Sequence, residues 1–349
     1  MYSFSGAGKP FSFGTVNHQL TQTTTDCVSK VRFSPVGFPA FLLGVTSWDC
    51  SCSVWQVQSN QNEIQAVPSF TTTHDAPILD LSFSYDGKAF FGGCSKTATM
   101  WNLSTNQKST VASHDLPISC LAYINHPQVN DLLITGSWDG KLRCWDLRQP
   151  NFIMEENLGE PIFALDVQRS KPMMAVATGR MVHIFHTDSM RKEDTLKPPD
   201  VVKFNIRCVS CSSDFEGVAA GTSEGRLSFL RMDKKPGCTF KAHIQGADVT
   251  QYVMYQTNFC VHHPSSPLVI SGGGDGVLAA VNRSTKKLLR SMQPELKIEN
   301  DPVPISAGDI SPDGSLIAYA HSYDWAMGRS GYRNQPTSVH IRKIEGDVK

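Results

Sequence analysis

Serine, histidine and aspartate recur together along the chain, and these residue types can form a nucleophilic triad. His114, Ser137 and Asp139 are the clearest set. An enzyme needs one copy of a triad, whereas parts of this pattern return elsewhere, as in Ser47 and Asp49. The repetition indicates a structural network of hydrogen bonds, and we expect the protein not to be an enzyme.

Two short motifs contain residues that could bind a metal ion. Cys208 and Cys211 have CxxC spacing, but no second cysteine pair lies at zinc-finger distance. On a strand, residues three apart point to opposite faces, so these two sulfurs would diverge. His262 and His263 are adjacent and would diverge in the same way. We therefore expect no metal site and no other cofactor.

The composition is that of a globular protein with no net charge. The chain has 349 residues, 32 of them basic and 32 acidic, and 40% are hydrophobic. This length can bury a large core, and any affinity for nucleic acid must come from a local basic patch. No stretch of the sequence is apolar enough to predict a membrane span. The ten scattered cysteines, with no secretory signal before them, indicate a reducing compartment.

Repeated units organise the chain. Trp55, Trp101 and Trp145 end three successive units of about 45 residues, the period of WD-type repeats. Within each unit, short apolar and β-branched runs are separated by turns such as Asp86-Gly87, which predicts strands joined by hairpins. Four weaker copies follow, the last ending near Ile341. The sequence predicts an all-β, seven-bladed WD-repeat propeller over residues 20–349, whose closed ring protects its sheet edges.

The polar residues of these units resemble the hydrogen-bond network of a WD repeat. His114, Ser137, Asp139 and Trp145 provide the four residue types that fix the turns of such a blade. The second unit has Ser95 at the aspartate position, and units four to six lack the terminal tryptophan. We expect those blades to be held more by apolar packing.

The first nineteen residues differ from the repeats. Residues 1–19 are rich in serine and glycine and predict a flexible tail. Within it, residues 11–14 (Phe-Ser-Phe-Gly) look like an FxFG nucleoporin motif, whose phenylalanines would insert into transport receptors. A tail without a partner is the alternative. The following run, Leu20 to Thr25, is expected to supply the outer strand that completes the last blade.

Four phrases carry a more specific likeness. In this order, residues 138–146, 223–227, 239–243 and 322–328 read WDGKLRCWD, SEGRL, TFKAH and SYDWAMG. From about Val28 onward the chain resembles messenger-RNA export factors of the Rae/Gle type, which are WD propellers associated with the nuclear pore. A spindle-checkpoint propeller is a related family and shares the Glu-Gly-Arg phrase.

The resemblance implies an adaptor that binds an acidic peptide motif of an FG nucleoporin on one propeller face. Arg226 matches the key arginine of the family, and Glu224 belongs to the same phrase. Arginine suits this role because its planar fork can bind a carboxylate with two hydrogen bonds. Trp48 and Trp138 lie at matched turn positions and could pack on apolar residues of the peptide. The alternative is that Arg226 is solvated and both tryptophans only pack their blades.

The resemblance also implies a single-stranded RNA site on a basic, aromatic edge. In this site cations would neutralise phosphates and an aromatic ring would stack on a base. At the position of a Trp-Asp phrase in the family, the chain has Val281 and Asn282, so one aromatic platform is missing. An ordinary exposed turn around the two adjacent lysines is the alternative. The matching residues are Phe240, Lys241, Arg283, Lys286 and Lys287, with Arg290 nearby.

The resemblance therefore places the protein in the nucleus and at the nuclear pore complex, and also in the cytoplasm. Its expected partners are an FG nucleoporin and messenger ribonucleoprotein, with no membrane. The alternative function is a spindle-checkpoint adaptor that uses the same face, and Arg226, to bind a similar motif in a kinase.

Overall fold

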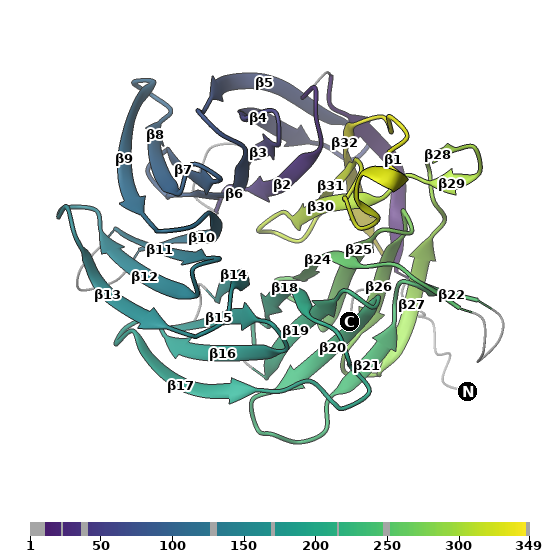
Figure 1. Cartoon of the computed structure of the whole chain (residues 1–349). Coiled ribbons are helices and arrows are strands. Elements are labelled where there is room, and N and C mark those ends of the chain that lie inside the picture. The colour runs from purple at the N-terminus through teal and green to yellow at the C-terminus, as the bar shows by residue number, and fades with distance from the viewer. Residues whose placement is uncertain are drawn as a thin grey trace, which may run out of the picture.

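Seven four-stranded antiparallel sheets form a ring around a central axis, as Figure 1 shows. The computed structural model describes residues 11–21, 24–35, 41–125, 131–168, 172–214, 216–246 and 252–346. The predicted all-β, seven-bladed propeller is confirmed. No helix in these ranges is long and apolar enough to cross a membrane.

The first three blades each use four consecutive strands. Blade one consists of β2 (Val28–Phe33), β3 (Phe41–Ser47), β4 (Ser51–Ser59) and β5 (Ile64–Thr73). Blade two consists of β6 (Ile78–Phe83), β7 (Lys88–Gly93), β8 (Thr97–Asn102) and β9 (Gln107–Ser113). Blade three consists of β10 (Ile118–Ile124), β11 (Leu132–Ser137), β12 (Lys141–Asp146) and β13 (Phe152–Asn157).

Blades four to six repeat this order. Blade four consists of β14 (Ile162–Gln168), β15 (Met173–Thr178), β16 (Met181–His186) and β17 (Arg191–Leu196). Blade five consists of β18 (Ile206–Cys211), β19 (Gly217–Thr222), β20 (Arg226–Arg231) and β21 (Cys238–Lys241). Blade six consists of β24 (Thr257–His262), β25 (Leu268–Gly273), β26 (Leu278–Asn282) and β27 (Lys287–Met292).

Blade seven joins the two ends of the chain. It consists of β30 (Ile305–Ile310), β31 (Leu316–His321), β32 (Ser338–Glu345) and β1 (Ser12–Gln19). Two small hairpins lie between blades: β22 (Ile244–Gln245) with β23 (Val253–Met254), and β28 (Lys297–Ile298) with β29 (Asp301–Pro302). A short 3-10 helix, η1 (Gly328–Gly331), lies in the loop between β31 and β32.

The burial of each strand follows its place in the blade. Second strands such as β11, β15 and β19 are buried at every residue, because blades pack against both of their faces. Outer strands are polar and mostly exposed, as in β17, which reads RKEDTL. Strands that are buried on both faces are therefore continuously apolar, and the outer strands, which are buried on one face at most, carry the charged residues.

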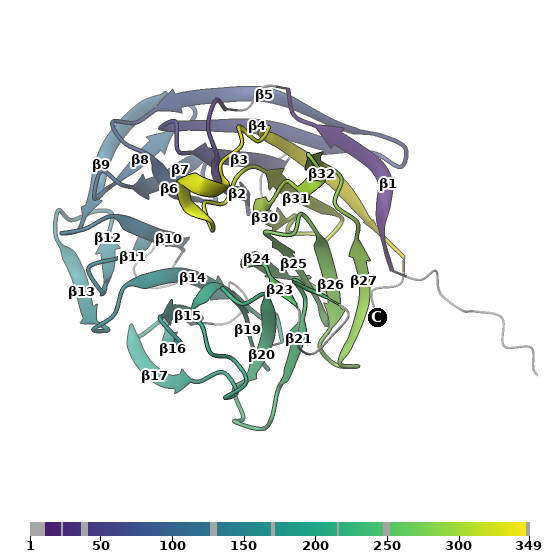
Figure 2. The same ribbon diagram turned by 45° about the vertical axis from the view of Figure 1, so that its right-hand side comes forward.

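The strand that closes the ring lies earlier in the chain than expected. β1 pairs with β32 from Ser12 to Gln19, so the prediction of a latch over Leu20 to Thr25 is wrong. Of that predicted run, Leu20 adds one backbone bond to Val339 O at 2.9 Å. Figures 1 and 2 show β1 beside β32. The propeller accordingly begins at Ser12, and the first ten residues lie outside the described part.

The FxFG-like segment is part of the core. Phe11 and Phe13 are buried, with their ring centroids 5.3 Å apart, in a cluster that includes Phe259. Their side chains belong to the packing that holds the two ends of the chain together. The expectation that they insert into transport receptors is therefore corrected, because neither ring is free to do so in this fold.

The first strands of the blades line an axial channel of about 970 Å³. Aspartates on these strands link neighbouring blades: Asp80 accepts a hydrogen bond from the Leu121 amide at 2.8 Å, and Asp309 accepts one from the Phe33 amide at 2.8 Å. Asp166 accepts one from the Cys211 amide at 2.7 Å. Buried carboxylates thus hold adjacent inner strands in register around the axis.

Candidate binding surfaces

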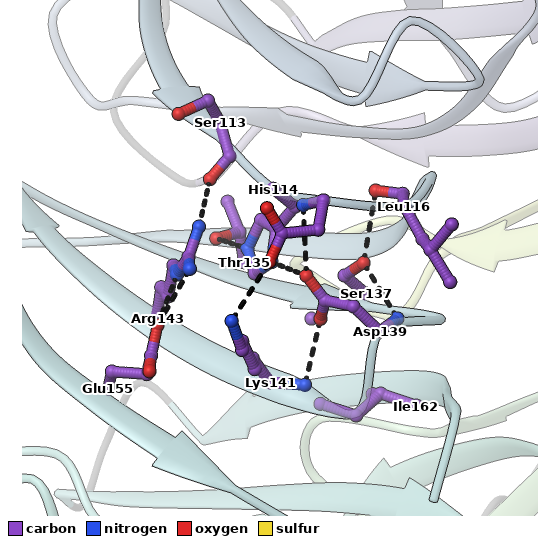
Figure 3. Close-up of polar contacts among 12 residues, drawn as sticks. Ser113, His114, Leu116, Thr135, Ser137, Asp139, Lys141, Arg143, Glu155 and Ile162 are labelled. Carbon is purple, nitrogen blue, oxygen red and sulfur yellow. Dashed lines mark hydrogen bonds and ion pairs between the residues drawn. The ribbon is translucent and has the colours of Figure 1, made fainter.

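The polar network of blade three fixes the turn that carries Trp138, as Figure 3 shows. Trp145 Nε1 donates to Thr135 Oγ1 at 2.9 Å, Thr135 Oγ1 lies 2.8 Å from His114 Nε2, and His114 Nδ1 lies 3.0 Å from Asp139 Oδ2. Burial lowers the pKa of His114 more than the nearby Asp139 raises it, so the ring is neutral at pH 7. With a neutral ring the hydrogen bonds all run in one direction. Trp145 Nε1 donates to Thr135, the Thr135 hydroxyl donates to His114 Nε2, and His114 Nδ1 donates to Asp139.

The sequence predicts that Ser137 provides the hydroxyl of this network, and this prediction is wrong. Thr135, not Ser137, connects the histidine to the tryptophan. Ser137 instead donates to the Leu116 carbonyl at 3.1 Å and accepts from the Asp139 amide at 3.1 Å. Its hydroxyl therefore fixes the turn directly, and the structural interpretation of this serine still holds.

Blade six has the same network without its tryptophan. His243 lies 2.9 Å from Asp275 through Nδ1 and 3.0 Å from Ser271 Oγ through Nε2. Sequence reasoning missed it because His243 and Asp275 are 32 residues apart, against 25 for His114 and Asp139. The hairpin β22–β23 accounts for the extra length.

Trp48 and Trp138 lie at equivalent places on one face of the ring. We call the face that carries the turns between second and third strands the upper face. The Trp48 amide donates to Cys27 O at 3.0 Å, and the Trp138 amide donates to Pro117 O at 3.1 Å. The rings are 38% and 37% exposed, and both line the mouth of the channel. The two tryptophans lie at matched turn positions, as the sequence predicts, and the exposed part of each ring is able to contact a ligand.

Arg226 and Glu224 lie together at the upper end of blade five. Glu224 is buried and accepts a hydrogen bond from the Lys203 amide at 3.1 Å. Its Oε1 lies 3.6 Å from Arg226 Nε, too far for a hydrogen bond, and this buried Nε has no other partner. The Arg226 side chain is 19% exposed, and its two terminal nitrogens form no hydrogen bond with any residue that the structure describes. Glu224 therefore orients the arginine without saturating it.

Two lysines lie close to the Glu224–Arg226 pair. Lys241 pairs directly opposite Arg226 in the register of β20 and β21, and its side chain is exposed. Lys203, whose amide donates to Glu224, is also exposed, whereas the exposed Arg207 on β18 lies over the Phe163 ring of blade four, 5.9 Å from its centroid. Sequence reasoning missed Lys203, because only the fold brings the segment before β18 beside the Glu-Gly-Arg turn.

The residues expected to bind RNA are spread along the outer strands of blades five and six. Lys241 ends β21 on the upper side, whereas Lys286 and Lys287 lie at the opposite end of the neighbouring blade, at the turn into β27. All three lysines are exposed. Phe240 is half-buried and packs on the core cluster that contains Val281. Arg290 pairs with Ala280 through its backbone, and its side chain lies outside the described part.

Arg283 has a different role from the one expected. Its side chain is almost completely buried, contacts Asp214 through Nη2, and lies 2.9 Å from Glu216 through Nη1. The guanidinium also stacks over the Phe229 ring, 5.1 Å from its centroid. This arginine ties the lower turns of blades five and six together. We correct the prediction that it binds RNA, because its charge is already neutralised inside the protein.

The motifs considered for metal binding do not converge. Cys208 and Cys211 belong to different core clusters, as their spacing on a strand predicts. Burial lowers the pKa of His262 to about 3 and also lowers that of His263. In the described ranges, no group of three or more histidine, cysteine or acidic side chains is arranged to hold a metal ion.

Comparison with known proteins agrees with this architecture. Residues 66–102 and 105–146 match the family described as WD domain, G-beta repeat. The solved structure of U3-55K matches 95% of this chain and 99% of that chain with a TM-score of 0.76, and at 16% identity it shows the fold alone.

The relatives found by sequence are more specific. Protein Rae1 of Drosophila melanogaster is 30% identical over 95% of each chain. An mRNA export factor of Xenopus tropicalis is 31% identical over 99% of this chain and 96% of that one. The WD40 repeat protein poxJ of Penicillium oxalicum is 32% identical over 93% of each. With these similarities over nearly its whole length, the chain belongs to the Rae1/Gle2 family of WD40-repeat mRNA export factors.

Proposed function

We propose that this protein is a non-enzymatic adaptor in the export of messenger RNA from the nucleus. It binds an acidic peptide motif of an FG nucleoporin on the upper face and single-stranded RNA along the outer edge of blades five and six. The names of its relatives support the role in export, and the surface around Arg226 supports the binding mode. This role places the protein at the nuclear pore, in contact with both nucleus and cytoplasm.

The observation that carries the proposal is the state of Arg226. Its guanidinium is positioned by a buried carboxylate but keeps both terminal nitrogens free of hydrogen bonds. These two donors match the two oxygens of a carboxylate on a visiting peptide. Lys203 and Lys241 add positive charge on either side of the Glu224–Arg226 pair. An acidic segment would therefore be attracted to blade five, with Trp48 and Trp138 available to its apolar residues.

The proposed RNA edge rests on three exposed lysines. Lys241 lies at its upper end, and Lys286 and Lys287 lie at its lower end. In the structure none of these three lysines forms an ion pair with a described carboxylate. The lysines would neutralise phosphates of a single strand that runs along the outer strands and release the counterions of the RNA. The exposed part of the half-buried Phe240 would contact a base.

The peptide site is tested by capture of nucleoporins with the tagged protein. Arg226→Glu should abolish co-purification of FG nucleoporins, because it replaces the free donors with a repelling charge beside Glu224. Arg191→Glu, an exposed change on the outer strand β17, is the matched control and should bind as the wild type does. Arg226→Gln removes the positive charge without adding a negative one, so it tests the site if Arg226→Glu fails to fold. Thermal melting first checks that each variant is folded. Unchanged binding by folded Arg226→Glu would reject the site.

The RNA edge is tested by titrating labelled single-stranded RNA at several salt concentrations. Lys286→Glu combined with Lys287→Glu should weaken binding and make its dependence on salt shallower, because fewer phosphates are neutralised. Lys108→Glu on β9, the outer strand of blade two, is the control. If affinity and salt dependence both stay as in the wild type, these two lysines are not part of an RNA site.

A further inference from the structure

The junction of blades seven and one carries a second unusual surface. The loop between β31 and β32, which contains η1, stands in front of the ring in both views (Figures 1 and 2). In this loop Trp325 has a left-handed backbone with φ of 58°, which is uncommon for a bulky residue. Its ring stacks on Tyr332 with centroids 5.6 Å apart and planes 6° from parallel. Tyr323 lies beneath them and donates to Gly328 O at 2.6 Å.

Cys27 brings this pair of rings next to Trp48 of blade one. The Cys27 carbonyl accepts from the Trp48 amide at 3.0 Å. The pKa of the Cys27 thiol is raised mainly by burial, and the Trp325 side chain acts on it in the opposite direction. The rings of Trp325 and Tyr332 are 45% and 43% exposed, similar to Trp48. Three large aromatic rings from two blades therefore reach solvent beside the mouth of the channel.

Three carboxylates lie among these rings. Asp26 accepts a hydrogen bond from the Cys27 amide at 2.6 Å, and Asp49 follows Trp48 and accepts from Thr24 at 2.6 Å. Asp324 precedes Trp325 and accepts from Asn258 at 3.1 Å. Burial alone would raise the pKa of Asp49, but hydrogen bonds from Ser51 and Thr24 outweigh it and lower that pKa, so this group stays ionised.

No described cation neutralises these carboxylates. Within 4.0 Å of Asp26, Asp49 and Asp324 there is no lysine or arginine in the described ranges, whereas Asp115 on the same face is paired with Lys141 at 2.9 Å. Arg329 and Arg333 belong to the loop, but among the described contacts neither lies over an aromatic ring. The corner formed by Trp48, Trp325, Tyr332, Asp26, Asp49 and Asp324 is therefore electron-rich, and its carboxylates form no ion pair with a described lysine or arginine.

This chemistry selects a weakly hydrated organic cation. Aromatic faces attract guanidinium and methylated ammonium groups through cation–π contacts, and a nearby carboxylate adds Coulomb attraction. An ordinary lysine ammonium is more strongly hydrated and loses more on desolvation. The rings lie on an open face at the mouth of the channel and not in a closed cavity, so the cation must be presented by a larger molecule.

We propose that this aromatic–acidic corner binds the side chain of an arginine or a methylated lysine in a partner polypeptide. The site is separate from Arg226 and attracts the opposite charge, so the upper face is divided between a cationic blade five and an anionic junction of blades seven and one. A partner that crosses the face would be selected by a basic residue at this corner as well as by acidic residues at Arg226.

The proposal is tested with short glycine-serine peptides that differ only at a central residue. Arginine, trimethyl-lysine, lysine and glutamate peptides are titrated against the full chain, and binding is followed by calorimetry. We expect the arginine or trimethyl-lysine peptide to bind at least tenfold more tightly than the glutamate peptide. The stronger of these two identifies the natural side chain.

Variants then locate the site. Asp26→Asn combined with Asp324→Asn, and separately Trp325→Leu, should each weaken binding of the cationic peptide at least fivefold. Tyr252→Leu, at another exposed aromatic ring, should leave it unchanged, as should Arg191→Glu on β17. Because the aspartate pair lies at the surface, it tests the site even if Trp325→Leu fails to fold. Equal binding of arginine and glutamate peptides, or full binding by the aspartate variant, would overturn the proposal.

Discussion

Single side chains in this protein are assigned to structural or binding roles by whether their polar atoms are already satisfied. Thr135 is buried and bonded to both of its neighbours, and Arg283 is buried with both terminal nitrogens paired to carboxylates, so both residues hold the blades together. Arg226 keeps two free donors although it lies beside a carboxylate. The residue types alone do not separate these cases, because an arginine next to acidic groups occurs in both.

The sequence identified the polar network but not its connecting hydroxyl. Thr135 and Ser137 are two residues apart on β11, so both point to the same side of the strand. Only the positions of His114 and Trp145 decide between them. Arg283 shows the same limit, since Asp214 and Glu216 precede it by 69 and 67 residues. Their contact depends on how blades five and six pack.

We predict that Thr135→Val lowers the free energy of unfolding by about 2 kcal/mol, because it leaves buried polar atoms of His114 and Trp145 without a partner. Thr135→Ser keeps the hydroxyl and should lose much less. Urea titration of both variants measures the difference. A valine variant as stable as the serine variant would show that this hydroxyl does not connect the network.

Strands of this propeller could be predicted from local patterns, but the strand that closes the ring could not. Hairpin turns and apolar runs lie close together in the sequence, so the units were recognisable before the fold was known. The pairing of β1 with β32 joins residues more than 300 positions apart, as in Asn17 with Arg342. The run expected to close the ring, Leu20 to Thr25, lies just after β1, and the packing of the buried Phe13 against blade six is not visible in a local pattern.

The closing strand gives a prediction at this scale. Phe13→Ala should lower the free energy of unfolding by about 3 kcal/mol, because it removes a buried ring from the contact between β1 and blade six. Thr15→Ala, exposed on the same strand, is the control and should cost less than about 0.5 kcal/mol. Thermal melting compares the two. Equal stability of both variants would contradict the place of Phe13 in the core.

The ring as a whole buries several histidines in neutral form. Burial lowers the pKa of His183 and that of His340 to about 4, and that of His262 to about 3. The unfolded chain takes up these protons near pH 6.5, before the folded ring does. Stability is therefore complete above pH 6.5 and is lost as the pH falls toward 4. Burial also raises the pKa of Asp166 and Asp309, which acts in the opposite direction at low pH.

We expect the free energy of unfolding to decrease by roughly 2 kcal/mol or more between pH 7 and pH 4.5, since each unit of pKa shift corresponds to about 1.4 kcal/mol. His183→Gln should make this decrease smaller, whatever it does to the stability at pH 7. Thr15→Ala, which removes no titratable group from the exposed side of β1, should leave the slope unchanged. A wild-type stability independent of pH over this range would refute the protonation argument.

The molecule as a whole combines a rigid ring with a charge-divided upper face. The fold class and the matched positions of Trp48 and Trp138 could be predicted from residues that recur at fixed spacing, and the family and Arg226 from the resemblance of four short phrases. The surroundings of Arg226 could not, because Lys203 in the loop before β18 and Lys241 on β21 come together with the Glu224–Arg226 pair only when blade five is formed.

Cross-linking from the upper face in cells tests the adaptor role most directly. A photoreactive amino acid in place of Lys203, beside the Glu224–Arg226 pair, is compared with the same amino acid in place of Val67, which is exposed on β5. Our account predicts that position 203 captures an FG nucleoporin through an acidic segment and that position 67 does not. Capture of the nucleoporin equally from both positions, or from neither, would contradict it.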